Sequence, residues 1–173
     1  MENFCKLDIS LNLNVLDGIH LPVYRTVRTK QKYSKWQQQT HDFIPIDILM
    51  ISGRRAKDYL LDQLPLSVLQ TEVPELSILE MNVPLNATDP IVGAHIDVGR
   101  ITTLNYYMEV NGEVTSFPDA KFTAEEGDMY MMDVTKVHSV SLTPGSRRRV
   151  LAMSFQRTDY DTLRRLCASK VCK

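Results

Sequence analysis

Short apolar runs recur along the chain and are separated by turn signals, a pattern typical of a β-rich protein. Residues 7–13 alternate strictly between apolar and polar side chains, which predicts a strand with one buried face. A second apolar run spans residues 44–51 and has Pro45 near its start. Because proline cannot donate to a sheet, this run predicts either an edge strand or a strand that begins after the proline.

Two segments have the periodicity of a helix instead. In residues 54–64, the side chains of Tyr59, Leu60 and Leu64 recur at helical spacing and are expected to face the core. Residues 159–168, near the C-terminus, predict a short helix on the surface. These helices are too few to form a core of their own, so we expect them to support the strands.

The segment from about residue 76 to residue 156 is dominated by strand signals. An Asn111-Gly112 pair separates two apolar runs and predicts a β-hairpin, since this dipeptide suits the tight turn of a hairpin. Many short strands at regular spacing favour a jelly roll. We therefore expect a mainly β (α+β) fold with a double-stranded β-helix core and a few supporting helices. The predicted strands cover residues 76–83, 93–97, 101–110, 113–117, 129–133, 138–142 and 148–156.

Composition indicates one ordinary globular domain over residues 1–173. The chain is 43% apolar and 24% charged, and its net charge of −1 gives no overall attraction to nucleic acid or to an anionic membrane. The N-terminal residues do not form a signal peptide, and no apolar run is long enough to span a membrane. Three cysteines, an odd number, favour reduced thiols and a cytoplasmic location.

The residues that predict chemistry are two histidines and one acid. His95 and Asp97 are one residue apart, so on an extended segment their side chains point to the same side. If the fold brings His138 beside them, two imidazoles and one carboxylate cap one face of a six-coordinate metal. This arrangement leaves three coordination positions open, as in non-haem Fe(II) oxygenases. Such a set also suits a metal-binding protein without catalytic activity, which acts as a sensor or sequestering module.

Residues 24–36 combine basic and aromatic side chains and contain no acid. This composition is found on nucleic-acid-binding surfaces, in solvated loops and in loops that cover a substrate. Of these alternatives, we favour a solvated loop, which is the commonest setting for such a run.

The motifs around these histidines resemble those of the Fe(II)- and 2-oxoglutarate-dependent dioxygenases, closest in spacing to the prolyl-hydroxylase-like branch. The resemblance covers about half the chain, from residue 76 to residue 156. It rests on three stretches, which read AHIDVGRITTLNYYMEVNGEVTSF, EEGDMYMMDVTKVHSV and PGSRRRVLAMSF. The resemblance implies that His95, Asp97 and His138 bind Fe(II) and that the protein uses 2-oxoglutarate and O2 as co-substrates.

Three consecutive arginines compete to anchor the distal carboxylate of 2-oxoglutarate. If Arg148 points inward, the small residues at 150, 152 and 154 also point inward and leave room for the co-substrate. If Arg147 or Arg149 pointed inward, leucine, methionine and phenylalanine side chains would crowd the site. We therefore predict Arg148 as the anchor, with Arg147 as the alternative.

The same alternation applies to the strand predicted before it. The resemblance implies that the hydroxyl of Tyr107 reaches the distal carboxylate of 2-oxoglutarate. If Tyr107 points inward, Thr103 and Asn105 do so too and give the cofactor site a polar lining. The alternative is that the tyrosines here only fill space in the sheet.

The family's halogenating relatives have a small residue in place of the carboxylate, so Asp97 favours a hydroxylase. We expect hydroxylation of a C–H bond in a peptidyl substrate, with proline as one candidate residue, or in a small molecule. Action on nucleic acid is less favoured, because that branch has a longer gap between its second histidine and its arginines.

Overall fold

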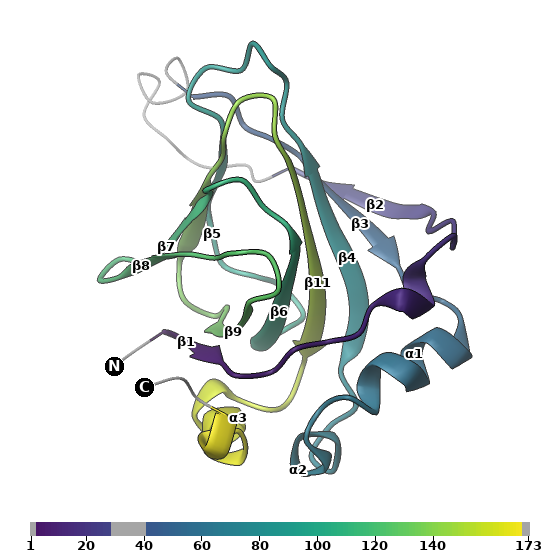
Figure 1. The fold of residues 1–173 in the computed structure, drawn as a ribbon. Coiled ribbons are helices and arrows are strands. Elements are labelled where there is room, and N and C mark those ends of the chain that lie inside the picture. Colours follow the sequence, from purple (N-terminus) through teal and green to yellow (C-terminus); the bar gives the residue numbers. More distant parts are fainter. Residues whose placement is uncertain (1–2, 29–40, 171–173) are drawn as a thin grey trace.

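The computed structural model describes residues 3–28 and 41–170, whose strands form two antiparallel sheets packed as a jelly roll (Figure 1). The mainly β fold predicted from the sequence is therefore confirmed. The major sheet contains, in spatial order, β1 (Phe4–Leu7), β9 (Met129–Asp133), β6 (Thr102–Glu109), β11 (Arg147–Phe155), β4 (Glu75–Asn82), β3 (Ile46–Met50) and β2 (Val23–Val27). The minor sheet contains β5 (Ile91–His95), β10 (His138–Ser141), β7 (Val114–Ser116) and β8 (Lys121–Thr123).

Side-chain alternation divides the interior into two apolar clusters, one on each face of the major sheet. Along β11, Leu151 and Met153 belong to the outer cluster, whereas Val150 and Ala152 belong to the inner cluster facing the minor sheet. Neighbouring strands keep the same division because directly paired residues point to the same face. The site described below lies on the inner face.

Helices cover the outer face of the major sheet. Figure 1 shows them together in the lower part of the view, and each contributes buried side chains to the outer cluster, among them Leu60, Val68 and Leu163. Within the described residues, no helix has both the length and the apolarity needed to cross a membrane. The helical elements are α1 (Arg54–Leu61), α2 (Leu66–Leu69), α3 (Tyr160–Leu166) and the 3-10 turns η1 (Asn14–Leu16) and η3 (Ala168–Lys170).

The predicted strand over residues 7–13 is wrong, because only Leu7 of that range lies in a strand. The strand is β1, which ends at Leu7 where its partner β9 begins at Met129. Beyond that pair, β9 offers no further partner in the sheet, so the chain leaves it. Ile9 and Leu11 still pack against the outer cluster, so the alternation marks burial rather than strand pairing.

The predicted hairpin at Asn111-Gly112 is also wrong. Gly112 has a φ of +74°, which suits a tight turn, but β6 before the turn belongs to the major sheet and β7 after it to the minor sheet. The turn therefore carries the chain from one sheet to the other. Local sequence specifies a turn, whereas the partners of each strand depend on packing over the whole barrel.

Other expectations have mixed outcomes. The strand over 44–51 is confirmed as β3, which starts just after Pro45 and is flanked by β2 and β4. In the first helix Leu60 is buried, but Tyr59 is 40% exposed and does not face the core. The sequence analysis did not predict strand β8. The basic and aromatic segment 24–36 begins within strand β2, and its residues from 29 onward lie outside the described residues.

A buried carboxylate fixes the turn where the chain leaves β11. Glu72, before β4, accepts hydrogen bonds of 2.9–3.0 Å from the backbone N–H groups of Gln156, Arg157 and Thr158 and from the Thr158 hydroxyl. Burial by itself would raise the pKa of Glu72, but these hydrogen bonds outweigh it and hold the pKa below its ordinary value. The ionised carboxylate therefore stabilises the fold.

We expect Glu72→Gln to lower the free energy of unfolding at pH 7 by about 2 kcal/mol, because its amide presents N–H groups to backbone donors. A group whose pKa is lowered by folding stabilises the protein above its unfolded-state pKa, and this contribution is lost as pH falls. The difference between wild type and variant should therefore shrink as pH falls below about 5. Urea unfolding at several pH values measures the difference in free energy of unfolding between wild type and Glu72→Gln. A difference that grew as pH fell would contradict this account.

Candidate metal centre and adjoining cavity

Pairing between two strands of the minor sheet brings the two histidines together. His95 is the last residue of β5, His138 is the first residue of β10, and the two are directly paired in the antiparallel register. Asp97 follows β5, where its backbone N–H donates to the Val134 carbonyl at 3.0 Å. The prediction that one extended strand carries both His95 and Asp97 is thus corrected, since the strand ends at His95 and a held loop presents the acid.

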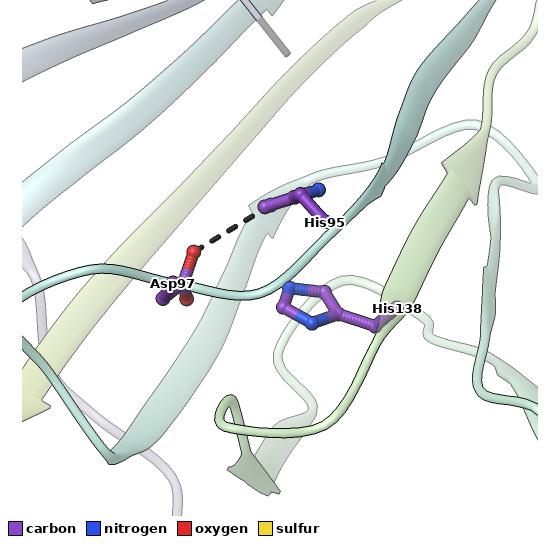
Figure 2. A group of neighbouring side chains, drawn as sticks. All are labelled: His95, Asp97 and His138. Atoms are coloured by element: carbon purple, nitrogen blue, oxygen red, sulfur yellow. Dashed lines mark ion pairs between the residues drawn. The ribbon is translucent and has the colours of Figure 1, made fainter. Parts of the chain in front are cut away.

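The three side chains converge on one space (Figure 2), and their candidate ligand atoms all lie within 4.8 Å of one another. His95 Nδ1 donates to the Gly93 carbonyl at 2.7 Å, and His138 Nδ1 donates to the Lys136 carbonyl at 2.9 Å. Because a carbonyl only accepts, these contacts place the proton on Nδ1 and leave Nε2 of each neutral ring able to bind a metal. Two imidazole nitrogens and one carboxylate oxygen form a donor set that fits Fe(II).

Electrostatics favour the protonation states that metal binding needs. Burial opposes ionisation of Asp97, but its interaction with the adjacent His95 imidazole and the charge of Arg100 outweigh burial and lower its pKa to about 2. Burial, followed by the neighbouring His95, lowers the pKa of His138 below its ordinary value. At neutral pH, Asp97 is therefore ionised and His138 is neutral.

Arg100 belongs to this centre, and sequence reasoning missed it. Its Nε donates to Asp97 Oδ2 at 2.9 Å and its Nη1 donates to the Ser154 hydroxyl at 3.0 Å. Asp97 Oδ1 lies on the other side, 3.5 Å from His95 Nε2. Arg100 thus occupies one carboxylate oxygen and leaves the other for a metal. A basic residue shortly after the motif was the only signal for it in the sequence.

A cavity of about 40 Å³ connects this group with Arg148 on the inner face of the major sheet. Thr103 and Asn105 line it as well, and the Thr103 hydroxyl donates to Asn105 Oδ1 at 2.9 Å. This volume holds a few water molecules. A larger ligand reaching Arg148 therefore requires the lining side chains to move.

Arg148 is the arginine that faces the cavity. It is 4% exposed, and no carboxylate of the described residues lies within ion-pair distance of its guanidinium. Its Nε has no hydrogen-bond partner among these residues, and its Nη1 lies 3.5 Å from the Met81 sulfur. Arg147 and Arg149 instead pair with Glu80 on the other face of the strand. A buried cation without a counter-charge is unfavourable, so this position is suited to an anionic ligand.

Tyr107 lies against this arginine. The guanidinium carbon of Arg148 is 5.2 Å from the centre of the Tyr107 ring, a cation–π contact. The Tyr107 hydroxyl is buried and has no partner in hydrogen-bond geometry within the described residues, although Thr115 and Asn105 lie near it. Burial raises the pKa of Tyr107, so the hydroxyl keeps its proton and can donate it to an anion.

A wider cleft of about 500 Å³ opens on the other side of the histidine–aspartate group. His95, Asp97 and Arg100 line both this cleft and the smaller cavity. Its volume falls in the range of small-molecule sites. The candidate metal centre therefore lies between a small cavity that ends at a buried arginine and an open cleft that a substrate can enter.

Comparisons with known proteins support the fold. No protein-family model matches the chain, and no curated protein matches it. Among solved structures, a Pseudomonas putida prolyl-4-hydroxylase has a TM-score of 0.53 at 16% identity, with 91% of this chain and 94% of that chain covered. A 2OG-Fe(II) oxygenase family oxidoreductase from Burkholderia pseudomallei has a TM-score of 0.45 at 12% identity, with 79% and 74% covered. A cupin 2 domain-containing protein from Halorhodospira halophila has a TM-score of 0.39 at 17% identity, with 83% and 89% covered.

These identities are too low to assign a family, and the similarity to the Pseudomonas structure extends over most of both chains. The comparison with the Pseudomonas structure therefore supports the fold alone. The chemistry has to be argued from the site.

We expect the protein to bind one divalent metal ion through His95, Asp97 and His138. Alanine at any of these positions should weaken Mn(II) binding by about 100-fold or more, and Arg100→Gln by about tenfold because Asp97 loses its orienting donor. Calorimetric titration measures both effects. His20→Ala removes an exposed imidazole outside the group and serves as the control. Equal affinity in wild type and His138→Ala would contradict the assignment.

Proposed function

We propose that the protein is an Fe(II)- and 2-oxoglutarate-dependent dioxygenase that hydroxylates a C–H bond. The observation that carries this proposal is the single cavity with a metal-binding donor set at one end and the buried, unpaired Arg148 at the other. A metal and a cation a short distance apart suit an acid that chelates the metal at one end and presents a carboxylate at the other.

Each residue of the site has a role in this proposal. His95, Asp97 and His138 hold Fe(II) on one face and leave positions open for the oxo acid and O2. Bound iron and oxo acid supply the oxidising chemistry, in which 2-oxoglutarate becomes succinate and CO2 as the substrate gains a hydroxyl group.

The remaining residues bind and orient the co-substrate. Arg148 pairs with its distal carboxylate, and Tyr107 donates its phenolic proton to the same group. Thr103 and Asn105 line the path between the carboxylate and the metal. Because Arg148 is buried, bulk solvent screens its charge little, which strengthens its attraction for an anion.

The substrate enters from the wider cleft, which reaches the metal group without crossing the co-substrate cavity. We propose a small molecule or a peptidyl residue, with proline as one candidate. The cleft is bordered by Ile96 and Val98, which are 54% and 94% exposed. Exposed apolar side chains beside a site suit contact with an apolar part of a substrate.

A metal- or ligand-binding protein without turnover is the second candidate, and the small volume of the inner cavity favours it. A cavity of about 40 Å³ holds water more readily than a dicarboxylate. The two candidates differ in whether bound 2-oxoglutarate is consumed.

We expect Fe(II) and 2-oxoglutarate, added without oxygen, to give a weak visible absorption band, because the oxo acid chelates the iron. Admission of O2 should then produce succinate slowly even without substrate. His95→Ala should give neither signal. A band without succinate would assign the protein to the non-catalytic candidate, and the absence of both signals in wild type would overturn the proposal.

Arg148→Met tests the co-substrate site against the matched variant Arg147→Met. Replacing a buried, unpaired charge with an apolar side chain should raise the free energy of unfolding of the ligand-free protein by about 1 kcal/mol. The same change should weaken 2-oxoglutarate binding by about tenfold or more. Arg147→Met should leave 2-oxoglutarate affinity unchanged. Thermal unfolding with and without the oxo acid measures both effects, and equal shifts in the two variants would contradict the role of Arg148.

A further inference from the structure

The wider cleft beside the metal group has an apolar floor and charged groups on its walls. Its floor comes from the inner face of two neighbouring strands, β3 and β4, and contains Ile46, Ile48, Met50 and Leu79. The cations that line it are Arg25, Arg28 and Arg100, and the carboxylates are Glu75 and Asp97. Arg100 and Asp97 neutralise each other through their ion pair, which leaves Arg25, Arg28 and Glu75 as the groups whose charges face a substrate.

Strand register directs Arg25 into the cleft. In the pairing of β2 with β3, Arg25 lies opposite Ile48 and Val27 lies opposite Ile46. Directly paired residues of antiparallel strands point to the same face. Ile46 and Ile48 form the floor, so Arg25 stands on the cleft side of the edge strand.

The acids of the neighbouring strands point away from the cleft. Asp47 is paired with Thr26 and accepts a hydrogen bond of 2.6 Å from its hydroxyl on the opposite face. Glu80, paired with Asp47, forms ion pairs with Arg147 and Arg149 on that face. These carboxylates are therefore unavailable to the arginines of the cleft.

Arg25 and Arg28 consequently have no paired carboxylate among the described residues. Neither forms an ion pair with any carboxylate of the described residues. The adjoining sequence, residues 24–36, contains no acid at all. Among the described lining residues, Glu75 is the one carboxylate outside the Arg100–Asp97 pair, so these residues give the cleft a net positive charge that a bound divalent metal would increase.

We propose that the cleft binds a substrate that carries an anionic group, a carboxylate or a phosphate, held by Arg25 and Arg28. The apolar part of the substrate lies on the floor formed by β3 and β4, beside the metal group. This inference rests on the proposed function in taking the cleft as the substrate side of the centre. It adds the charge of the substrate, which the metal ligands do not specify.

Two matched pairs of small probes test the charge requirement in metal-free protein. Hippurate and hippuramide share a benzoylglycyl group, which ends in a carboxylate in hippurate and in a neutral amide in hippuramide. Phenyl phosphate and phenol make the same comparison for a phosphate. The dissociation constant of each probe, measured from amide chemical shifts, should be lower for the anion of each pair. Whichever anion binds more tightly identifies the carboxylate or the phosphate as the preferred group.

Variants assign the effect to the cleft. The double variant Arg25→Gln/Arg28→Gln should weaken binding of the better anion by about tenfold, because two charge-assisted hydrogen bonds are lost. Glu75→Gln should strengthen it by about twofold, because a repelling charge is removed. The double variant Arg54→Gln/Arg55→Gln removes the same two charges from exposed side chains of α1 outside the cleft and should have no effect. Hippuramide and phenol should bind equally to all of these proteins.

Unchanged anion binding in the double variant would overturn the inference. Binding that survives the double variant but is lost in Arg148→Gln would also overturn it, by placing the anion in the inner cavity. The probes are titrated without metal, so these results do not depend on the proposed function. That function is contradicted by a different result, the absence of metal binding or of 2-oxoglutarate binding. If the protein bound anions through Arg25 and Arg28 but bound no metal, the anion site would be supported and the proposed dioxygenase function would be contradicted.

Discussion

The alternation of side chains across the major sheet is the constraint on which the rest of the structure depends. Strand β11 is hydrogen-bonded to β6 on one side and to β4 on the other, so its register sets which residues of both neighbours face inward. The outward residues form a cluster with the helices, and the inward residues face the minor sheet. A shift of one residue would exchange these sets and bury Arg147 and Arg149 in place of Arg148.

Charge distribution follows from the same alternation. Arg147 and Arg149 are directed to Glu80 on the outer face, whereas Arg148 is directed inward, where the described residues provide no counter-charge. On β2, Arg25 is likewise separated from Asp47 by the thickness of the sheet. Arg148 and Arg25 therefore face the inner side of the sheet, whereas Glu80 and Asp47 lie on its outer face. This separation is the physical basis for proposing anionic ligands in both cavities.

Much of the fold could be predicted from local sequence. Several strands were placed with nearly the observed limits, because alternation and turn residues are local properties. The Asn111-Gly112 turn was located correctly, yet it joins two sheets rather than the strands of a hairpin. The limit of β1 was missed because it depends on where β9 begins. For the site, strand parity predicted which face of β11 carries Arg148, and the structure places that residue on the inner face.

The sequence by itself determined which residue types are available and which side chains share a face. Two histidines, an aspartate and an inward arginine follow from residue identity and the period of two along a strand. Only the tertiary structure decided that β5 and β10 pair with His95 opposite His138, and that Arg100 reaches Asp97 and Ser154. It also decided that Arg25 borders the same cleft as Asp97. These relations join residues far apart in the chain, and their distances are set by sheet pairing and barrel closure, which no local pattern encodes.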